Sequence, residues 1–336
     1  MTPRAIIRLP PETPPILCVV IHTEEEFDWA REHDRSATAV SHMRHIHRAQ
    51  ELFESFGIVP TYVVDYPIAS QEEGYRPLLP YVRAGRATVG AHLHPWVSPP
   101  HEEQVCRFNT YPGNLPAALE REKLRILTET IATNFGVRPR AYLAGRYGFG
   151  PHTASILMEL GYEVDISPAP PIDFRADGGP DYSGYTSDPF WLDEGPRLLG
   201  LPGTGAYVGL LRGLGAPLYR LLTAPALRPA RLPGIASRLR LFERIRLSPE
   251  DYTGPEMRRL TRSLLARGVR IFVFSFHSPS VHPGHTPYVP SPAALERFLT
   301  ECRAYFAFFL GEIGGQTSTP IEIKATLERP ATRPRG

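Results

Sequence analysis

The sequence predicts an α/β fold, either a barrel or a doubly wound sheet, in which about seven strands alternate with helices. Short apolar runs recur along the chain, and segments with apolar residues at helical spacing lie between them. The first run, residues 16–21, is continuously apolar and β-branched, which is typical of a strand buried on both faces of a parallel sheet. With 42% hydrophobic and 21% charged residues, the composition excludes collagen, coiled coil and wholesale disorder.

The expected strands and helices follow one another in regular alternation. Helical periodicity covers residues 38–56, which end at Gly57, and residues 75–84. A long helix is stopped by Gly136, and the last helix begins at Ser291, which is followed by proline at the first helical position. Strands are expected at residues 16–21, 59–64, 87–91, 141–144, 162–166, 198–201 and 269–276.

Residues 1–325 are predicted to form a single domain, and residues 326–336 a disordered tail. An insertion rich in arginine and leucine interrupts the alternation at residues 203–247. The segment from 195 to 242 contains seven arginines and no acidic residue. It is either a helical segment that lies over the barrel mouth or on an anionic lipid surface, or a solvated excursion without a partner.

The charge balance and the cysteines indicate which binding partners and which cellular compartment to expect. The 37 Lys and Arg residues nearly balance the 35 Asp and Glu residues, and this formal net charge of +2 does not favour nucleic acid as a partner. Cys18, Cys106 and Cys302 show no metal or redox spacing and fit a reducing compartment. Neither a signal peptide nor a membrane helix of ~20 apolar residues is found, so a cytoplasmic location is expected. The sequence does not indicate an oligomeric state.

Polar side chains follow several of the predicted strands. The carboxyl ends of the strands meet at one edge of an α/β barrel or open parallel sheet, and active sites are built at that edge. The polar residues therefore predict one common site. They are His22, Glu24, His92, His94, Arg146, Asp165 and His277.

Three of these residues have the types found in a catalytic metal site. Alternation along a strand puts His92 and His94 on the same side, and Glu24 can join them from the first strand. Two imidazoles and a carboxylate bind a catalytic Zn²⁺ or a similar divalent ion, which lowers the pKa of a bound water to ~7. His42 and His45, by contrast, have no carboxylate placed with them and are expected on a solvated helix face.

Five different motifs occur in order along the chain. They are the acidic strand end at Glu24, Gly90-Ala-His-Leu-His-Pro-Trp96, Gly145-Arg-Tyr-Gly148, Val164-Asp-Ile-Ser167 and Phe274-Ser-Phe-His-Ser-Pro279. The series resembles that of the NodB-type polysaccharide deacetylases, carbohydrate esterase family 4, and Glu24-Glu-Glu-Phe-Asp-Trp29 is most similar to their WalW-like branch. The resemblance covers about residues 16–310. It implies a distorted (β/α) barrel and a metal-dependent hydrolase that removes acetyl groups from N-acetylated sugars.

The resemblance also implies a role for each site residue. Glu24 matches the metal carboxylate of the family, and His92 and His94 match its two metal histidines. Three other residues match the remaining motifs: Arg146 the arginine that holds the catalytic base, Asp165 the acid of the fourth motif, and His277 the general acid.

His22 departs from the family pattern, because such enzymes place an aspartate general base two residues before the metal carboxylate. A neutral imidazole can accept a proton, but two neighbouring cations would depress its pKa, and Asp28 is the alternative base. The sequence therefore predicts N-deacetylation of an amino sugar or polysaccharide precursor. It leaves open a catalytically impaired carbohydrate-binding relative and another metal-dependent C–N hydrolase.

Overall fold

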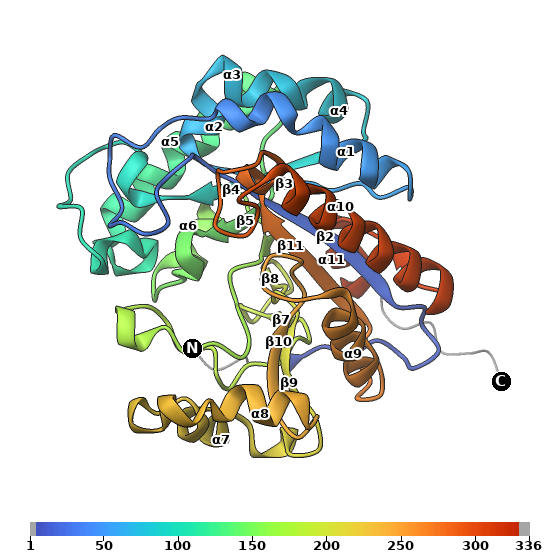
Figure 1. Cartoon of the computed structure of the whole chain (residues 1–336). Coiled ribbons are helices and arrows are strands. Elements are labelled where there is room, and N and C mark those ends of the chain that lie inside the picture. Colours follow the sequence, from blue (N-terminus) through green and yellow to red (C-terminus); the bar gives the residue numbers. More distant parts are fainter. Residues whose placement is uncertain (1–4, 329–336) are drawn as a thin grey trace.

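The computed structural model describes residues 5–328 of the chain, and its centre is a curled, mainly parallel sheet (Figure 1). Seven parallel strands lie side by side in the order β11 (Ile271–His277), β2 (Ile16–Thr23), β3 (Thr61–Val64), β4 (Thr88–Leu93), β5 (Ala141–Ala144), β6 (Val164–Asp165) and β8 (Leu199–Gly200). The antiparallel strands β7 (Phe190–Trp191) and β1 (Ala5–Ile6) extend the sheet beyond β8, and β12 (Gln316–Thr317) pairs with β2. The sheet forms an open half-barrel, which confirms the predicted fold class.

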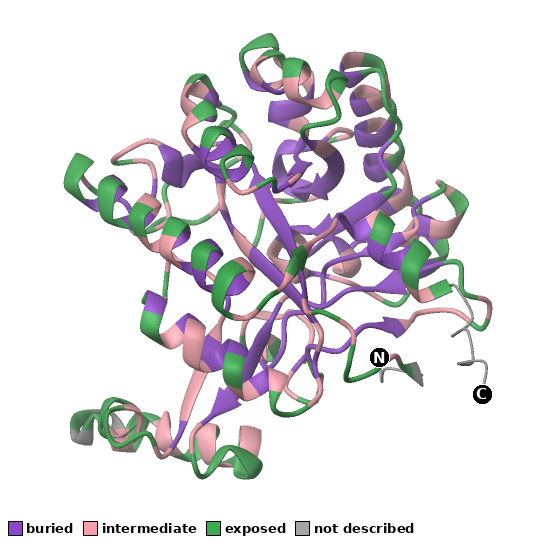
Figure 2. Ribbon diagram, turned by 90° about the vertical axis from the view of Figure 1, so that its right-hand side faces the viewer, coloured by how far each residue is buried: buried purple, intermediate pink, exposed green. Residues whose placement is uncertain are grey.

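The helices cover the outer side of the sheet, where their buried faces share one large apolar core with it (Figure 2). They are α1 (His47–Glu54), α2 (Tyr66–Ser70), α3 (Glu72–Tyr75), α4 (Leu79–Arg83), α5 (Ala117–Phe135), α6 (Thr153–Glu159), α9 (Gly254–Leu265) and α10 (Pro292–Ala307), whereas α11 (Pro320–Glu328) lies on the other side. A second, smaller core on the other side of the sheet contains Ile16, Cys18 and Val20 of β2, and Ile323 of α11 packs into it.

The arginine-rich insertion forms a hairpin with a helical extension. Strand β9 (Gly205–Val208) pairs antiparallel with β10 (Glu243–Arg246). Between them, α7 (Gly215–Leu222) and α8 (Leu232–Arg238) project from the body of the molecule, at the bottom of Figure 1. Residues 209–242 are called the lobe below.

The predicted strands are all present in the parallel part of the sheet, each within two residues of its expected start. The expected helix ends are also observed: Gly57 and Gly136 have φ values of 65° and 72°, and the Ser291 side chain caps α10 by accepting from the Ala294 amide. Strands β1, β7 and β12, which have two residues each, are too short to show a period.

The C-terminal region differs from the expectation. Residues 326–328, which were expected in the tail, are the last residues of α11, and residues 329–336 lie outside the described part. Among the helices of residues 5–328, none combines the length and apolar character needed to cross a membrane.

Candidate metal centre

A cavity of about 600 Å³ lies at the carboxyl ends of the parallel strands. Strand periodicity directs side chains into it: Cys18 and Val20 face the smaller core, so His22 and Glu24, which continue the same spacing, lie on that side of the sheet. Six of the seven predicted site residues line the cavity: His22, Glu24, His92, His94, Arg146 and His277.

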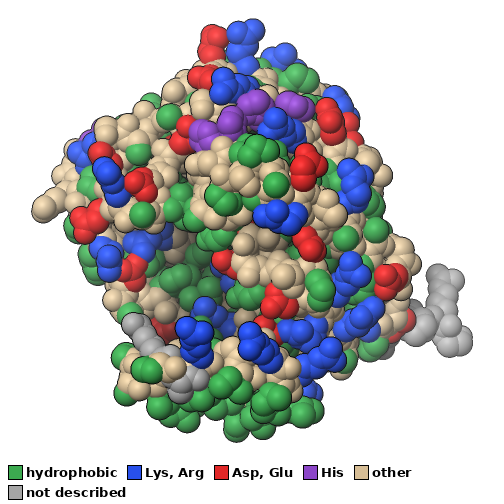
Figure 3. Space-filling view, in the orientation of Figure 1, with side chains coloured by type: hydrophobic (Ala, Val, Ile, Leu, Met, Phe, Trp, Pro, Cys, Tyr) green, Lys and Arg blue, Asp and Glu red, His purple; other side chains and the backbone are tan. Residues whose placement is uncertain are grey.

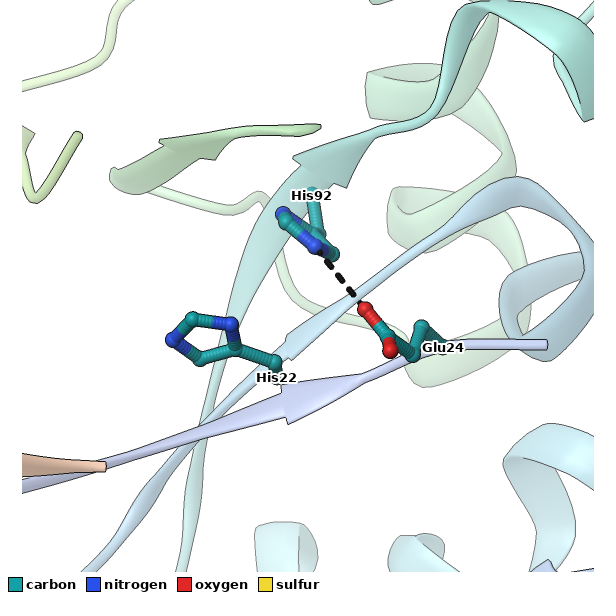
Figure 4. A group of neighbouring side chains, drawn as sticks. All are labelled: His22, Glu24 and His92. Atoms are coloured by element: carbon teal, nitrogen blue, oxygen red, sulfur yellow. Dashed lines mark hydrogen bonds and ion pairs between the residues drawn. The ribbon is translucent and has the colours of Figure 1, made fainter. Parts of the chain in front are cut away.

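The Glu24 carboxylate lies between two imidazoles. Its Oε2 atom is 3.3 Å from His92 Nε2 and 3.5 Å from His94 Nε2, and all three side chains are buried. Figure 4 shows His92 pointing from β4 toward Glu24 at the end of β2, with His22 on the same side of β2. His22, Glu24 and His92 each place a potential ligand atom within 4.8 Å of the others.

Hydrogen bonds on the far side of each ring fix which nitrogen faces Glu24. His92 Nδ1 lies 2.8 Å from the Leu143 carbonyl oxygen, which can only accept, so Nδ1 carries the proton and Nε2 has a free lone pair. His94 Nδ1 lies 2.7 Å from Glu25 Oε2, so the ionised form of Glu25 holds the proton of His94 on Nδ1. A metal-binding histidine is usually oriented by such a partner on its second nitrogen.

A buried acidic pair supports His94 from behind. Glu25 also accepts a 2.7 Å hydrogen bond from the Trp96 indole nitrogen, and Trp96 stacks on His94 with ring centroids 4.2 Å apart. The Glu25 amide donates to Asp65, whose other oxygen caps α2. Burial raises the pKa of Glu25 to about 7, and burial together with Glu25 raises the pKa of Asp65. Glu25 thus contacts His94 at Nδ1, while Glu24 faces Nε2, and Glu25, Asp65 and His94 also place potential ligand atoms within 4.8 Å of one another.

The residues at this centre fit a divalent metal ion. Glu24 Oε1 is buried and has no hydrogen-bond partner among the described residues. Burial raises the pKa of Glu24, but the charge of His277 and the close contacts with His92 and His94 outweigh this effect and lower it to about 2. Burial and His92 lower the pKa of His94 well below its usual range, so this ring is neutral. An ionised carboxylate and two imidazole nitrogens form the ligand set of a catalytic zinc site with open positions.

Neither a protein-family model nor a curated protein matches this sequence. Among solved structures, the chain is similar to a proposed polysaccharide deacetylase from Mycobacterium smegmatis, with a TM-score of 0.51 and 17% identity over 100% of this chain and 99% of that one. The chain has the fold of the NodB-type polysaccharide deacetylases.

Other structures with this fold carry different names. Puue allantoinase has a TM-score of 0.53 and 16% identity, covering 96% of this chain and 92% of its own. A GH57 branching enzyme from Thermococcus kodakaraensis has a TM-score of 0.51 and 12% identity, covering 94% of this chain and 72% of its own. Because the deacetylase fold is found in proteins with several activities, the reaction must be argued from the site.

His22 is a neutral imidazole in the middle of the cavity wall. Its ring centroid lies 4.7 Å from that of His277, 5.5 Å from His92 and 5.8 Å from Tyr147. Burial, followed by the charge of His277, lowers the pKa of His22 well below its usual range. Within residues 5–328 the ring forms no hydrogen bond, so its nitrogens remain available to a ligand in the cavity.

His277 is protonated and faces the same cavity as His22. Its Nδ1 lies 2.7 Å from Glu250 Oε2, and Glu250 also accepts hydrogen bonds from the His277 amide and from Ser280. Burial lowers the pKa of His277, but Glu250 and Glu24 raise it to about 10. With Nδ1 held by Glu250, Nε2 carries the proton that His277 can donate.

Arg146 lines the cavity but does not hold His22. Its guanidinium pairs with Asp177, donates to Thr110 Oγ1 at 2.6 Å and stacks on Tyr111 at 4.2 Å. Asp28, the alternative base, caps the Ala30 amide and pairs with Arg31 at 3.1 Å, so its carboxylate is engaged in its own loop.

Arg246 at the end of β10 is the arginine whose charge acts on His22. It donates to the Tyr147 hydroxyl at 2.8 Å and lies 4.8 Å over that ring, yet no carboxylate among residues 5–328 forms an ion pair with it. Sequence reasoning missed Arg246, because it lies within the insertion and follows no parallel strand.

Asp165 is the one predicted site residue that the structure places away from the cavity. It is fully buried in β6, its Oδ1 accepts from Ser167, and its Oδ2 has no partner among the described residues. Burial raises the pKa of Asp165 to about 7.

Lys123 holds the loop that follows β4. This residue was not identified from the sequence either. This buried side chain donates to the carbonyl oxygens of Pro95, Ser98 and Pro100 and pairs with Glu103 at 3.0 Å. The helical periodicity of α5 gave no signal for it, because a lysine on a helix is normally solvated.

The expectation of a solvated face was wrong for His42. This residue is buried, and its two ring nitrogens contact Glu26 and Ser278 at 3.0 and 2.7 Å. It therefore joins the loops that follow β2 and β11.

Proposed function

We propose that this protein is a divalent-metal-dependent hydrolase, with Zn²⁺ as the metal, that removes an N-acetyl group from an amino sugar or a polysaccharide precursor. The observation that carries the proposal is the arrangement of the cavity. An ionised carboxylate with two oriented imidazole Nε2 atoms lies on one side, and a protonated histidine held by Glu250 lies beside it. Amide hydrolysis needs both a metal-type electrophilic centre and an acid for the leaving nitrogen.

Each group has one task in the reaction. Glu24, His92 and His94 would hold a zinc ion, which when bound would supply an acidic water and polarise the acyl carbonyl. His22 accepts a proton from the attacking water, since its ring is neutral and free. His277 donates its Nε2 proton to the amine nitrogen as the C–N bond breaks, so that one water and one N-acetyl group give acetate and an amine.

The cavity wall fits a sugar with an acidic substituent. Trp29 and Tyr288 provide aromatic side chains in the cavity wall against which a pyranose ring can pack. Arg246 has further N–H donors available beside His22, because its one hydrogen bond within the described residues goes to the Tyr147 hydroxyl. Guanidinium donors of this kind bind a carboxylate or phosphate. The substrate we infer therefore carries a negative charge close to its acetamido group.

Two other functions remain as candidates. The low pKa of His22 favours a carbohydrate-binding or regulatory protein that has lost its base. The likeness to an allantoinase favours another metal-dependent C–N hydrolase. Free Cys18, Cys106 and Cys302 support the proposal that the protein acts in a reducing compartment such as the cytoplasm.

Acetate release from a panel of N-acetylated sugars, with and without a carboxylate or phosphate, tests the proposal. We expect release from acidic members, and Arg246→Met should raise KM for these at least about ten-fold while leaving KM for neutral members unchanged. Binding without acetate release would support the regulatory candidate. Release of ammonia or of another acid from small amides would support the alternative of another metal-dependent C–N hydrolase.

A further inference from the structure

The lobe carries most of the exposed apolar surface of the molecule. Nine large hydrophobic side chains are exposed among residues 5–328, and six of them lie in the lobe. They are Leu210 (78% exposed), Leu239 (62%), Leu221 (59%), Leu214 (55%), Ile235 (48%) and Leu211 (42%). Figure 3 shows hydrophobic side chains gathered at the lower end of the molecule, where α7 and α8 lie. Exposed apolar patches of this kind mark interaction surfaces.

Four arginines of the lobe border this apolar surface without an acidic partner among residues 5–328. Arg212, Arg231, Arg238 and Arg240 are exposed, and none forms an ion pair within the described residues. The lobe contains no Asp or Glu at all. In Figure 3, blue side chains lie directly above the green ones at this end. The lobe therefore combines a protruding apolar tip with an unneutralised positive rim.

The lobe contacts the cavity side of the molecule. Arg220 of α7 pairs with Asp173 at 3.0 Å, and Arg244 of β10 lies 4.4 Å over the Tyr219 ring. Phe174, which follows Asp173, lines the cavity, and so does Arg246 at the end of the same hairpin. A surface that binds the lobe would consequently lie beside the cavity.

We propose that the lobe docks the protein onto an anionic lipid surface, with its leucines in the interfacial region and its arginines on acidic headgroups. Positive charge beside protruding leucines is the composition of interfacial membrane segments. A symmetric contact with a second copy would place the same unpaired arginines opposite one another. Nucleic acid would leave the leucines against a charged backbone.

Sedimentation with vesicles tests this docking. The intact protein should sediment with vesicles of phosphatidylglycerol and phosphatidylcholine at about 0.1 M salt and not with phosphatidylcholine alone. Binding should fall at about 1 M salt, where the screening length drops from ~10 Å to ~3 Å. Absence of binding to the anionic vesicles at the lower salt would overturn the proposal.

Two sets of variants locate the binding surface. Leu210→Ser with Leu239→Ser, and separately Arg212→Glu with Arg238→Glu, should each reduce vesicle binding about ten-fold or more. The matched controls are Ile6→Ser with Val137→Ser, and Arg297→Glu with Arg303→Glu on α10, which change exposed residues of the same types elsewhere.

The remaining outcomes are also decisive. Lobe variants that bind as well as the controls would overturn the proposal. A lipid-free dimer that the leucine variants dissociate would do the same, because the patch would then be an interface between copies. All of these side chains are exposed, so the fold should survive each change, which a thermal melt checks.

Discussion

Single side chains on the rim of the sheet decide what the cavity can bind. His94 illustrates the point, because Glu25 contacts its Nδ1 atom and Glu24 faces its Nε2 atom. The candidate metal ligand Glu24 and the residue that orients His94 are therefore neighbours in the loop after β2. Of the triplet after β2, sequence reasoning selected only Glu24. The sequence did not distinguish Glu25 from a solvated acidic residue, because its partners Asp65 and Trp96 lie in the segments that follow β3 and β4.

Glu25→Gln should weaken zinc binding by roughly 10- to 100-fold, the usual effect of losing the group that orients a metal histidine. A glutamine keeps the shape but cannot accept from both His94 and Trp96 with two carboxylate oxygens. Zinc affinity measured by competition with a chelating dye checks this, and Glu296→Gln on the exposed face of α10 is the control. Unchanged affinity in Glu25→Gln would show that His94 does not depend on it.

His22→Asp should raise deacetylation, and His22→Ala should lower it. An aspartate would place a carboxylate near Arg246, which forms no ion pair with a carboxylate among residues 5–328, and would supply an anionic proton acceptor beside the metal centre. Initial rates of acetate release at fixed zinc concentration are the measurement. If His22→Ala were as active as the parent, the proton acceptor would be another group.

Elements position the site through contacts that sequence patterns do not display. The parallel strands were predictable because buried β-branched runs and helical periodicity are local signals. The hairpin β9–β10 was not, since its pairing joins residues separated by the whole lobe. The support of the β4 loop was equally hidden, because Lys123 reaches it from the middle of α5.

Lys123→Met should lower the free energy of unfolding by about 3–5 kcal/mol, because it leaves three carbonyl oxygens without their donor and leaves the buried Glu103 with only the more distant Arg35, at 3.7 Å, as a cation. Denaturant unfolding measures this loss. Lys324→Met is the matched control, and it should cost about 1 kcal/mol or less since its partners Glu163 and Glu328 are partly exposed.

Glu120 in α5 should make the free energy of unfolding depend on pH. Burial raises the pKa of Glu120 to about 7, from 4.5. The folded state therefore holds a proton that the unfolded state releases, and this contribution is full below pH ~4.5 and is lost as pH rises through ~7. Glu120→Gln should stabilise the protein at pH 8 by about 3 kcal/mol or less, and by little at pH 4.5.

Unfolding free energies at the two pH values check this, with Glu122→Gln as the control. Glu122 lies on the exposed side of the same helix and pairs with Arg125. An equal effect of the two variants at pH 8 would remove the assigned role of burial at Glu120.

The whole molecule combines an inner site with an outer lobe. The half-barrel brings side chains from β2, β4 and β11 to one cavity, and the motif order along the chain was enough to predict that meeting. The relation of the lobe to the cavity was not predictable, because it depends on long-range pairs such as Arg220 with Asp173. Composition had shown the positive charge of the lobe, and the structure adds its exposed leucines.

The central claim is that the Glu24–His92–His94 centre holds a metal ion that acetyl hydrolysis requires. The most direct measurement is acetate release from an acidic N-acetylated sugar by the metal-stripped protein, before and after zinc is added, for the parent and for Glu24→Gln. We expect zinc to restore release in the parent and in the Glu296→Gln control, while Glu24→Gln binds little zinc and stays inactive. Release that persists without metal, or that survives in Glu24→Gln, would contradict the account.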